Sequence, residues 1–506
     1  MAATGGVLLA VVGPPTSFVP GVWLAPAALY GALVLAAPLG EGRGRFRRFV
    51  GGGAMGFAFG FACNVMTFRF VPDVIVRFTP LPWVAGAMAV VLLAWAQGLR
   101  YFVLEHLYRA MAKRRVPPVV AFGVATYLST FVPMIFPWTP AGGATAWPVT
   151  VQLAELCGER FLTGLFAVLS ALLVEALRHR RTPRRATYFA GGAALIATAL
   201  MVYGSVRIRA VEAARKGAPA AAVALVQPSI EARERWEKGR AAAILTKLTD
   251  LTKRAEAAGA ELVVWPEAAY PYSLSATGRR APVGSYAPLQ AGVRGPVLTG
   301  ALTHKERDAM NSAVVIHGDG TVSEPYHKMH LLWFGETVPL ADVWPWVRKT
   351  FARGTGLVPG EAQLILPAGN VRAAVLNCFE DTVPAAGREA GLVSPNLLVN
   401  ITNDAWFAGS QESALHLRVA VMRSVETRRD MVRAVNHGPT SWVAATGRIA
   451  GVIEPTEPSF LMAKPALLEL PATPYVRFGE TPWVLMSVAA AALLVARARG
   501  RRSSPT

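Results

Sequence analysis

The stretch AVLNCFE, residues 374–380, places a cysteine directly after a run of apolar residues. A short apolar run of this kind is typical of a buried strand. Cys378 stands just past the end of that strand, which is where layered α/β domains collect their reactive groups. We therefore treat Cys378 as a candidate nucleophile, although a small buried residue of the core would follow the same pattern.

Two further stretches place an ionisable side chain close to an apolar segment. VVWPE, residues 263–267, ends in Glu267, and YHKMH, residues 326–330, carries Lys328. A thiol needs a base to remove its proton or a cation to lower its pKa, and a tetrahedral oxyanion needs a positive group. Glutamate, lysine and cysteine together supply these functions. Taken singly, Glu267 could cap a helix and Lys328 could be a solvated charge, so spacing leaves both explanations open.

Residues 207–480 surround these stretches and alternate between short apolar strands and charged helices. This alternation predicts a separate, layered α/β domain. A hairpin is expected at the Gly-Asp-Gly turn of residues 318–320. The expected strands are 220–226, 261–265, 297–302, 371–376, 396–401, 431–435 and 441–445, and the expected helices are 238–257 and 412–429.

The rest of the chain is apolar enough to cross a membrane. Of the 506 residues, 53% are apolar and 16% are charged, and a helical span needs about 20 apolar residues. We expect an N-terminal membrane domain, 1–206, with about seven spans of which the first is short, and a C-terminal helix with a basic tail, 481–506. The apolar runs are 5–13, 20–39, 49–68, 80–99, 116–136, 161–177, 187–206 and 482–496.

The basic residues gather in alternate connections between these runs. Lys and Arg number 51 against 32 Asp and Glu, a formal charge of +19. The positive-inside rule places the basic connections and the C-terminus in the cytoplasm, and the 207–480 domain on the periplasmic face of a bacterial inner membrane. Anionic lipid accounts for the charge, so we expect no nucleic-acid partner. The basic segments are 43–48, 100–115, 178–185 and 497–502.

Cysteine and histidine usage argues against a disulfide framework and a metal site. The three cysteines, Cys63, Cys157 and Cys378, are too few and odd in number. The histidines lack a ligand spacing with cysteines or acids. No phosphate-binding loop or dinucleotide fingerprint is present in the sequence. We expect neither a cofactor nor a metal, and Cys63 and Cys157 are expected to be bystanders.

The three strand-end stretches resemble the nitrilase superfamily, and with the apolar runs they resemble the apolipoprotein N-acyltransferase family over nearly the whole chain. The resemblance implies an α-β-β-α sandwich next to a multi-span helical membrane domain. It further implies that Glu267 is the general base, Lys328 stabilises the tetrahedral intermediate, and Cys378 is the acylated nucleophile. A phospholipid acyl donor, a diacylated apolipoprotein acceptor and a monomer within the lipid bilayer are the partners and state that it implies.

Further segments carry the same resemblance. KMHLLWFGETVPL, residues 328–340, contains Glu336 at the family's second functional glutamate. NDAWF (403–407) and TPYVRFGETP (473–482) also follow the family pattern. The implied supporting residues are Glu336, Glu380, Trp236 and Phe379. Implied scaffold residues are His416, Arg423, Glu426, Arg429, Arg433 and Asn436.

The chain departs from the family pattern at three places. Phe379 stands where the family has tyrosine, Trp333 replaces a proline, and residues 228–229 are Pro-Ser where the family has glycine followed by a polar residue. These departures put acyl preference and rate in doubt more than the reaction type.

Aromatic residues after Lys328 suggest a membrane-facing loop. Tryptophan favours the boundary between lipid and water, so we expect the 333–358 loop to admit lipid tails, although core or interface packing is the alternative. The residues concerned are Trp333, Phe334, Trp344 and Trp346.

Two other functions stay open on the sequence. One is a membrane-tethered member of the superfamily that acts on a small amide or nitrile. The other is a transporter or a lipoprotein-handling scaffold without catalysis, whose spans should carry charges along a path. Among the predicted spans only Glu175, near a helix end, is such a charge.

Overall fold

The computed structural model describes residues 1–36, 45–237, 239–333, 335–337, 356–454 and 457–500. The chain forms two compact units. The helical unit combines Met1–Arg207 with Phe478–Thr506, and the sheet unit is Ile208–Arg477.

Close packing of apolar helices builds the helical unit. A Cβ on Gly6 would lie 2.1 Å from the carbonyl oxygen of Phe59, and one on Gly56 would lie 2.0 Å from that of Tyr101. Glycines at such crossings let helices approach closely, as in membrane bundles. The helices are α1 (Ala2–Ala10), α2 (Gly21–Leu35), α3 (Arg45–Gly51), α4 (Ala54–Thr67), α5 (Val71–Phe78), α6 (Trp83–Lys113), α7 (Pro118–Ser129), α8 (Pro140–Gly143), α9 (Ala154–Arg178), α10 (Pro183–Gly217), which ends in the sheet unit, and α16 (Thr481–Gly500).

Within the described residues, three helices, α6, α9 and α10, are long and apolar enough to cross a membrane. The bent pair α4 and α5 would make a fourth, and α2, α7 and the described part of α16 are apolar but shorter. Every predicted apolar run coincides with a helix of this unit. The helical unit is thus that of a multi-pass membrane protein, and the number and sidedness of its spans stay predictions.

More charges are buried in this unit than the sequence suggested. Besides Glu175, the side chains of Glu105, Glu155 and Glu159 are almost fully buried. Each has its own partner: Tyr30 donates to Glu175, Gly56 N–H and Arg109 to Glu105, Arg207 to Glu155, and Thr139 to Glu159. Paired carboxylates of this kind satisfy their charges locally and do not form a continuous path.

The first sheet of the sheet unit runs in the order β13-β1-β2-β4-β5-β6, with β3 also paired to β4. Strands β1, β2 and β4 are parallel, and β13, β5 and β6 pair antiparallel to their neighbours. The strands are β1 (Val223–Gln227), β2 (Leu262–Val264), β3 (Ser273–Ser275), β4 (Val297–Lys305), β5 (Asp308–Ile316), β6 (Tyr326–His327) and β13 (Ser459–Ala463).

The second sheet runs in the order β12-β11-β10-β9-β8-β7. Its central strands β8, β9 and β10 are parallel, so their carboxyl ends meet at one edge. The strands are β7 (Ile365–Ala368), β8 (Val371–Asn377), β9 (Leu397–Asn403), β10 (Met431–Asn436), β11 (Thr440–Val443) and β12 (Ile449–Ile453).

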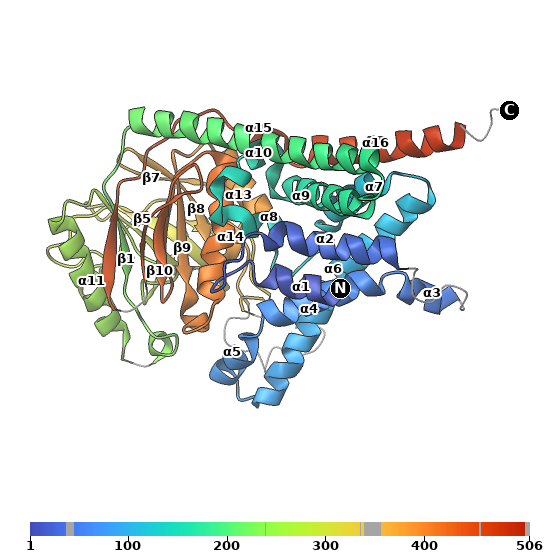
Figure 1. The fold of residues 1–506 in the computed structure, drawn as a ribbon. Helices are drawn as coiled ribbons and strands as arrows, with labels where there is room; N and C mark the ends of the chain where they lie inside the picture. Colours follow the sequence, from blue (N-terminus) through green and yellow to red (C-terminus); the bar gives the residue numbers. More distant parts are fainter. Residues whose placement is uncertain (37–44, 238, 334, 338–355, 455–456, 501–506) are drawn as a thin grey trace. The chain divides into compact units, whose positions relative to one another are not determined.

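Alternation along the strands makes a four-layer sandwich. Val375 packs between the two sheets, whereas its neighbour Leu376 packs outward against α13 (Pro384–Leu392) and α14 (Glu412–Thr427). In the first sheet, Val226 packs outward against α11 (Ala241–Ala257). Figure 1 shows α11, the two sheets and α14 in this order. The predicted α-β-β-α sandwich is confirmed.

The expected strands and helices of this unit are present, with ends shifted by a few residues. Strands β3, β5, β6, β7, β12 and β13 and helix α13 were not expected. Of these, β12 and most of β13 are only half-buried and β7 contains Pro367, so their apolar patterns are weak.

Candidate active site

Glu267 lies three residues after β2, in a turn that packs tightly on β4. A Cβ on Gly300 would lie 2.7 Å from the Cα of Glu267, so glycine is needed for this approach. The next residue, Ala268, has a φ of 48°, in the left-handed region that side chains other than glycine rarely adopt. The turn therefore fixes the backbone at Glu267.

Cys378 begins the 3-10 turn η5 (Cys378–Thr382) directly after β8. Its φ is 55°, also left-handed. The Asn400 Nδ2 group donates to the carbonyl oxygens of Leu376 at 2.9 Å and Cys378 at 3.0 Å. Strain held in this way at a strand end is common where a side chain must be presented to a substrate.

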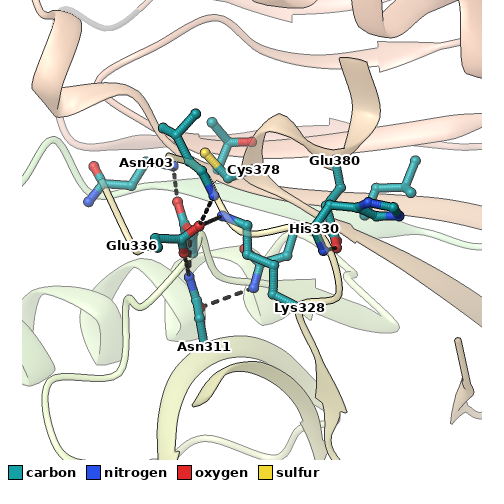
Figure 2. A network of polar contacts seen from close by, with 12 residues as sticks. Asn311, Lys328, His330, Glu336, Cys378, Glu380 and Asn403 are labelled. Atoms are coloured by element: carbon teal, nitrogen blue, oxygen red, sulfur yellow. Dashed lines mark hydrogen bonds and ion pairs between the residues drawn. The ribbon is translucent and has the colours of Figure 1, made fainter. Parts of the chain in front are cut away.

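Lys328 joins two carboxylates beside this turn. Its Nζ lies 3.3 Å from Glu267 Oε1 and 2.8 Å from Glu336 Oε2. The side chain of Lys328 is 2% exposed, so water screens these ion pairs little. Figure 2 shows the Cys378 sulfur beside this network, and the charges of all three groups act on its thiol. The structure thus gathers the residues that the sequence proposed from separate strand ends.

Asn311, on β5, links the parts of the site and was not singled out from the sequence. Its Nδ2 donates to Glu267 Oε1 at 2.7 Å and to Glu336 Oε1 at 2.8 Å. Its Oδ1 accepts from Asn377 Nδ2 at 3.0 Å. An amide in the middle of the apolar strand sequence MNSAVV was the available signal, because a buried polar side chain needs partners.

Glu380 accepts four hydrogen bonds and holds two segments together. Its Oε1 accepts from the N–H groups of Met329 at 2.8 Å and His330 at 3.0 Å. Its Oε2 accepts from Asn377 N–H at 2.7 Å and from the Tyr326 hydroxyl at 2.8 Å. The backbone beside Lys328 is thereby tied to the turn of Cys378, which is a supporting role (Figure 2).

The electrostatics of the site favour a charged lysine and a protonated thiol at rest. Burial alone would lower the pKa of Lys328, yet Glu267 and Glu336 raise it well above its usual range. Burial, then the charge of Glu267, raises the pKa of the Cys378 thiol, and Lys328 only partly opposes this. Burial disfavours ionised Glu336, but Lys328 lowers its pKa overall. The thiol therefore needs a base at the moment of attack.

The remaining predicted site residues lie at different distances from this network. The Lys328 Nζ is 5.9 Å from the centre of the Phe379 ring, within cation–π range. Trp333 is 50% exposed, and Trp236 ends the 3-10 turn η3 (Glu234–Trp236). Phe334, Trp344 and Trp346 lie outside the described residues.

Asp404, Glu412 and His416 form a second polar cluster that sequence spacing missed. Their potential ligand atoms lie within 4.8 Å of one another. His416 Nε2 is 2.8 Å from Asp381 and Nδ1 is 3.3 Å from Asp404, so both ring nitrogens face carboxylates. This pairing outweighs burial and raises the pKa of His416 well above its usual range. An imidazolium has no lone pair for a metal, so the arrangement fits a proton better than a metal ion.

We expect the Glu412→Gln variant to lose less stability with rising pH than the parent. Burial, then the charge of Asp404, raises the pKa of Glu412 from 4.5 to about 8. Between these values the folded chain keeps a proton that the unfolded chain has lost, so stability falls as pH rises. Glutamine has no such proton. From pH 5 to pH 8 the melting temperature should fall by about 3 °C less in the variant.

Thermal unfolding in detergent, followed by sheet-unit circular dichroism, measures this difference. Glu457→Gln, at an exposed carboxylate, is the matched control. Parallel pH curves for Glu412→Gln and the parent would show that Glu412 ionises at its ordinary pKa.

Comparison with known proteins adds to this geometry. The carbon-nitrogen hydrolase family model matches residues 222–465. The apolipoprotein N-acyltransferase of Geobacter metallireducens is 30% identical over 99% of this chain and 95% of its own length, and that of Bradyrhizobium diazoefficiens is 28% identical over 95% and 93%. Among solved structures, a mutant of the Nesterenkonia AN1 amidase, from the nitrilase superfamily, covers 52% of this chain and 95% of its own, with 18% identity and a TM-score of 0.39.

The sandwich of two sheets and the family match define a membrane protein with a carbon-nitrogen hydrolase domain. This is an acyltransferase of the nitrilase superfamily. More narrowly, the chain belongs to the apolipoprotein N-acyltransferase family.

Proposed function

We propose that the chain transfers an acyl chain from a phospholipid to the N-terminal amine of S-diacylglyceryl-cysteine in an apolipoprotein, through a thioester on Cys378. The observation that carries the proposal is the buried network in which Glu267 and Lys328 meet beside the Cys378 thiol. Full-length similarity to the family supports the choice of substrates.

In the first step Glu267 removes the thiol proton and the Cys378 sulfur attacks the ester carbonyl of the phospholipid. Lys328 uses two donors on Glu267 and Glu336, which leaves one donor for the oxyanion as far as the described residues show. The tetrahedral adduct then breaks its ester C–O bond. The leaving alkoxide takes the proton from Glu267, and lysophospholipid and the thioester result.

In the second step the neutral α-amine of the acceptor attacks the thioester. Glu267 takes the amine proton, the C–S bond breaks, and the thiolate recovers that proton as the amide forms. The Glu267 carboxylate is held by Asn311 and by the Asn403 N–H at 3.1 Å, so one oriented base can serve both steps.

We further propose the arrangement of the chain about the bilayer. Residues 1–206 form the membrane domain, 207–480 the periplasmic catalytic domain, and 481–506 the last span with a cytoplasmic tail. The basic connections support this orientation in a bacterial inner membrane. The protein acts as a monomer, and Trp333 lies in the loop that meets lipid.

Intact-mass analysis of the protein after incubation with phospholipid vesicles tests the function. We expect a mass increase of one acyl chain on the parent and on Cys63→Ser, and its loss when a diacylated lipopeptide is added. Small amides such as acetamide should give no adduct. An adduct from small amides alone, or none from phospholipid, would contradict the proposal.

A further inference from the structure

His416 lies between the two turns that frame the site. Its Nε2 meets Asp381, in the turn η5 that Cys378 begins, at 2.8 Å. Its Nδ1 meets Asp404, the first residue of the 3-10 turn η6 (Asp404–Phe407), at 3.3 Å. All three side chains are at least 95% buried. One ring therefore bridges two segments that are separate in sequence.

Both turns bear directly on the reacting groups. Asp381 lies three residues after Cys378, and Arg433 Nε holds its other oxygen at 3.0 Å. Asp404 follows Asn403, whose N–H donates to Glu267 Oε2. A shift of either turn would therefore move the thiol or the carboxylate that takes its proton.

The charges around His416 are balanced. Ionised Asp381 and Asp404 face the imidazolium of His416 on α14 and the guanidinium of Arg433 on β10, while Glu412 on α14 keeps its proton because burial and Asp404 raise its pKa to about 8. Asp404 Oδ2 and Glu412 Oε2 have no hydrogen-bond partner among the described residues.

The charge of Asp404 reaches the nucleophile. After burial and Glu267, with Lys328 opposing, Asp404 is a further group that raises the pKa of Cys378. A positive charge on His416 offsets that effect, because it lies against the same carboxylate. Without it, a buried negative charge would stand uncompensated near the thiol.

We propose that His416 is a positioning residue whose imidazolium locks the turns of Cys378 and Asn403 together and keeps the Cys378 thiol acidic enough for Glu267 to deprotonate. The proposal rests on the proposed function for its meaning in catalysis. It concerns the thiol itself, however, and can be measured without any acyl substrate.

The test is the pH dependence of alkylation of Cys378 by iodoacetamide in the full-length protein in detergent, followed by mass spectrometry of the peptide that contains it. In His416→Gln the rate at pH 8 should fall about tenfold, which corresponds to a rise of about one unit in the pKa of the thiol. The double variant His416→Gln/Asp404→Asn removes one charge of each sign and should recover most of the rate.

Two further variants complete the design. Asp404→Asn alone should alkylate faster than the parent, which keeps the test decisive if His416→Gln fails to fold. His304→Gln, an exposed histidine on β4, should match the parent. An unchanged profile in His416→Gln, or a double variant no faster than the single one, would overturn the proposal. Failure of the phospholipid reaction in the parent would instead count against the proposed function.

Discussion

Cys378→Ala should abolish both the acyl adduct and acyl transfer to a diacylated lipopeptide. Loss of the nucleophile removes the covalent route, and we expect turnover to fall by at least about 10⁴-fold. Cys378→Ser should also be nearly inactive, because Glu267 must then deprotonate a far less acidic hydroxyl. Product formation by mass spectrometry in a reconstituted bilayer measures both losses.

The fold should survive these substitutions. Cys378 is only partly buried, and alanine can adopt the backbone that Asn400 and the η5 turn impose there. Its melting temperature should therefore stay within about 2 °C of the parent. Cys157→Ala, at a buried cysteine of α9 in the helical unit, is the control that should keep turnover. Residual transfer by Cys378→Ala above the rate without enzyme would remove Cys378 from the mechanism.

The sequence predicted the parts of the site that follow a local rule. Glu267 and Cys378 stand just beyond strands whose apolar runs are long enough to recognise, and parallel strands carry their ends to a shared edge. Lys328 follows a strand of only two residues, so the family resemblance and not periodicity singled it out. The sandwich itself followed from the same resemblance and from the alternation of strands and helices.

The missing parts depend on contacts between residues far apart in the chain. Asn311 lies 44 positions from Glu267 and 25 from Glu336, and only folding shows that one amide serves both carboxylates. The partners of His416 are 35 and 12 positions away. Pattern reasoning reads neighbours along one element, so it recognised neither network.

Lys328→Met should reduce both stability and activity. The substitution leaves Glu267 and Glu336 buried without their shared cation, which costs about 3 kcal/mol at pH 7 and lowers the melting temperature by roughly 6 to 10 °C. Loss of the oxyanion partner should lower transfer by a further 10²- to 10³-fold, approximately. Lys305→Met, at an exposed lysine of β4, should change neither quantity.

A second substitution separates these two effects of Lys328. In Lys328→Met/Glu336→Gln the site has the same net charge as the parent, because one cation and one carboxylate are removed together. The melting temperature should therefore return most of the way to that of the parent, since a single remaining carboxylate is still held by Asn311 and Asn403. Transfer should not return, because nothing in the double variant can donate to the oxyanion where the ammonium stood. Thermal unfolding and the lipopeptide assay on the same preparations decide the matter. If activity recovered together with stability, Lys328 would be a structural counter-ion for the two glutamates, and oxyanion stabilisation would have to come from elsewhere in the site.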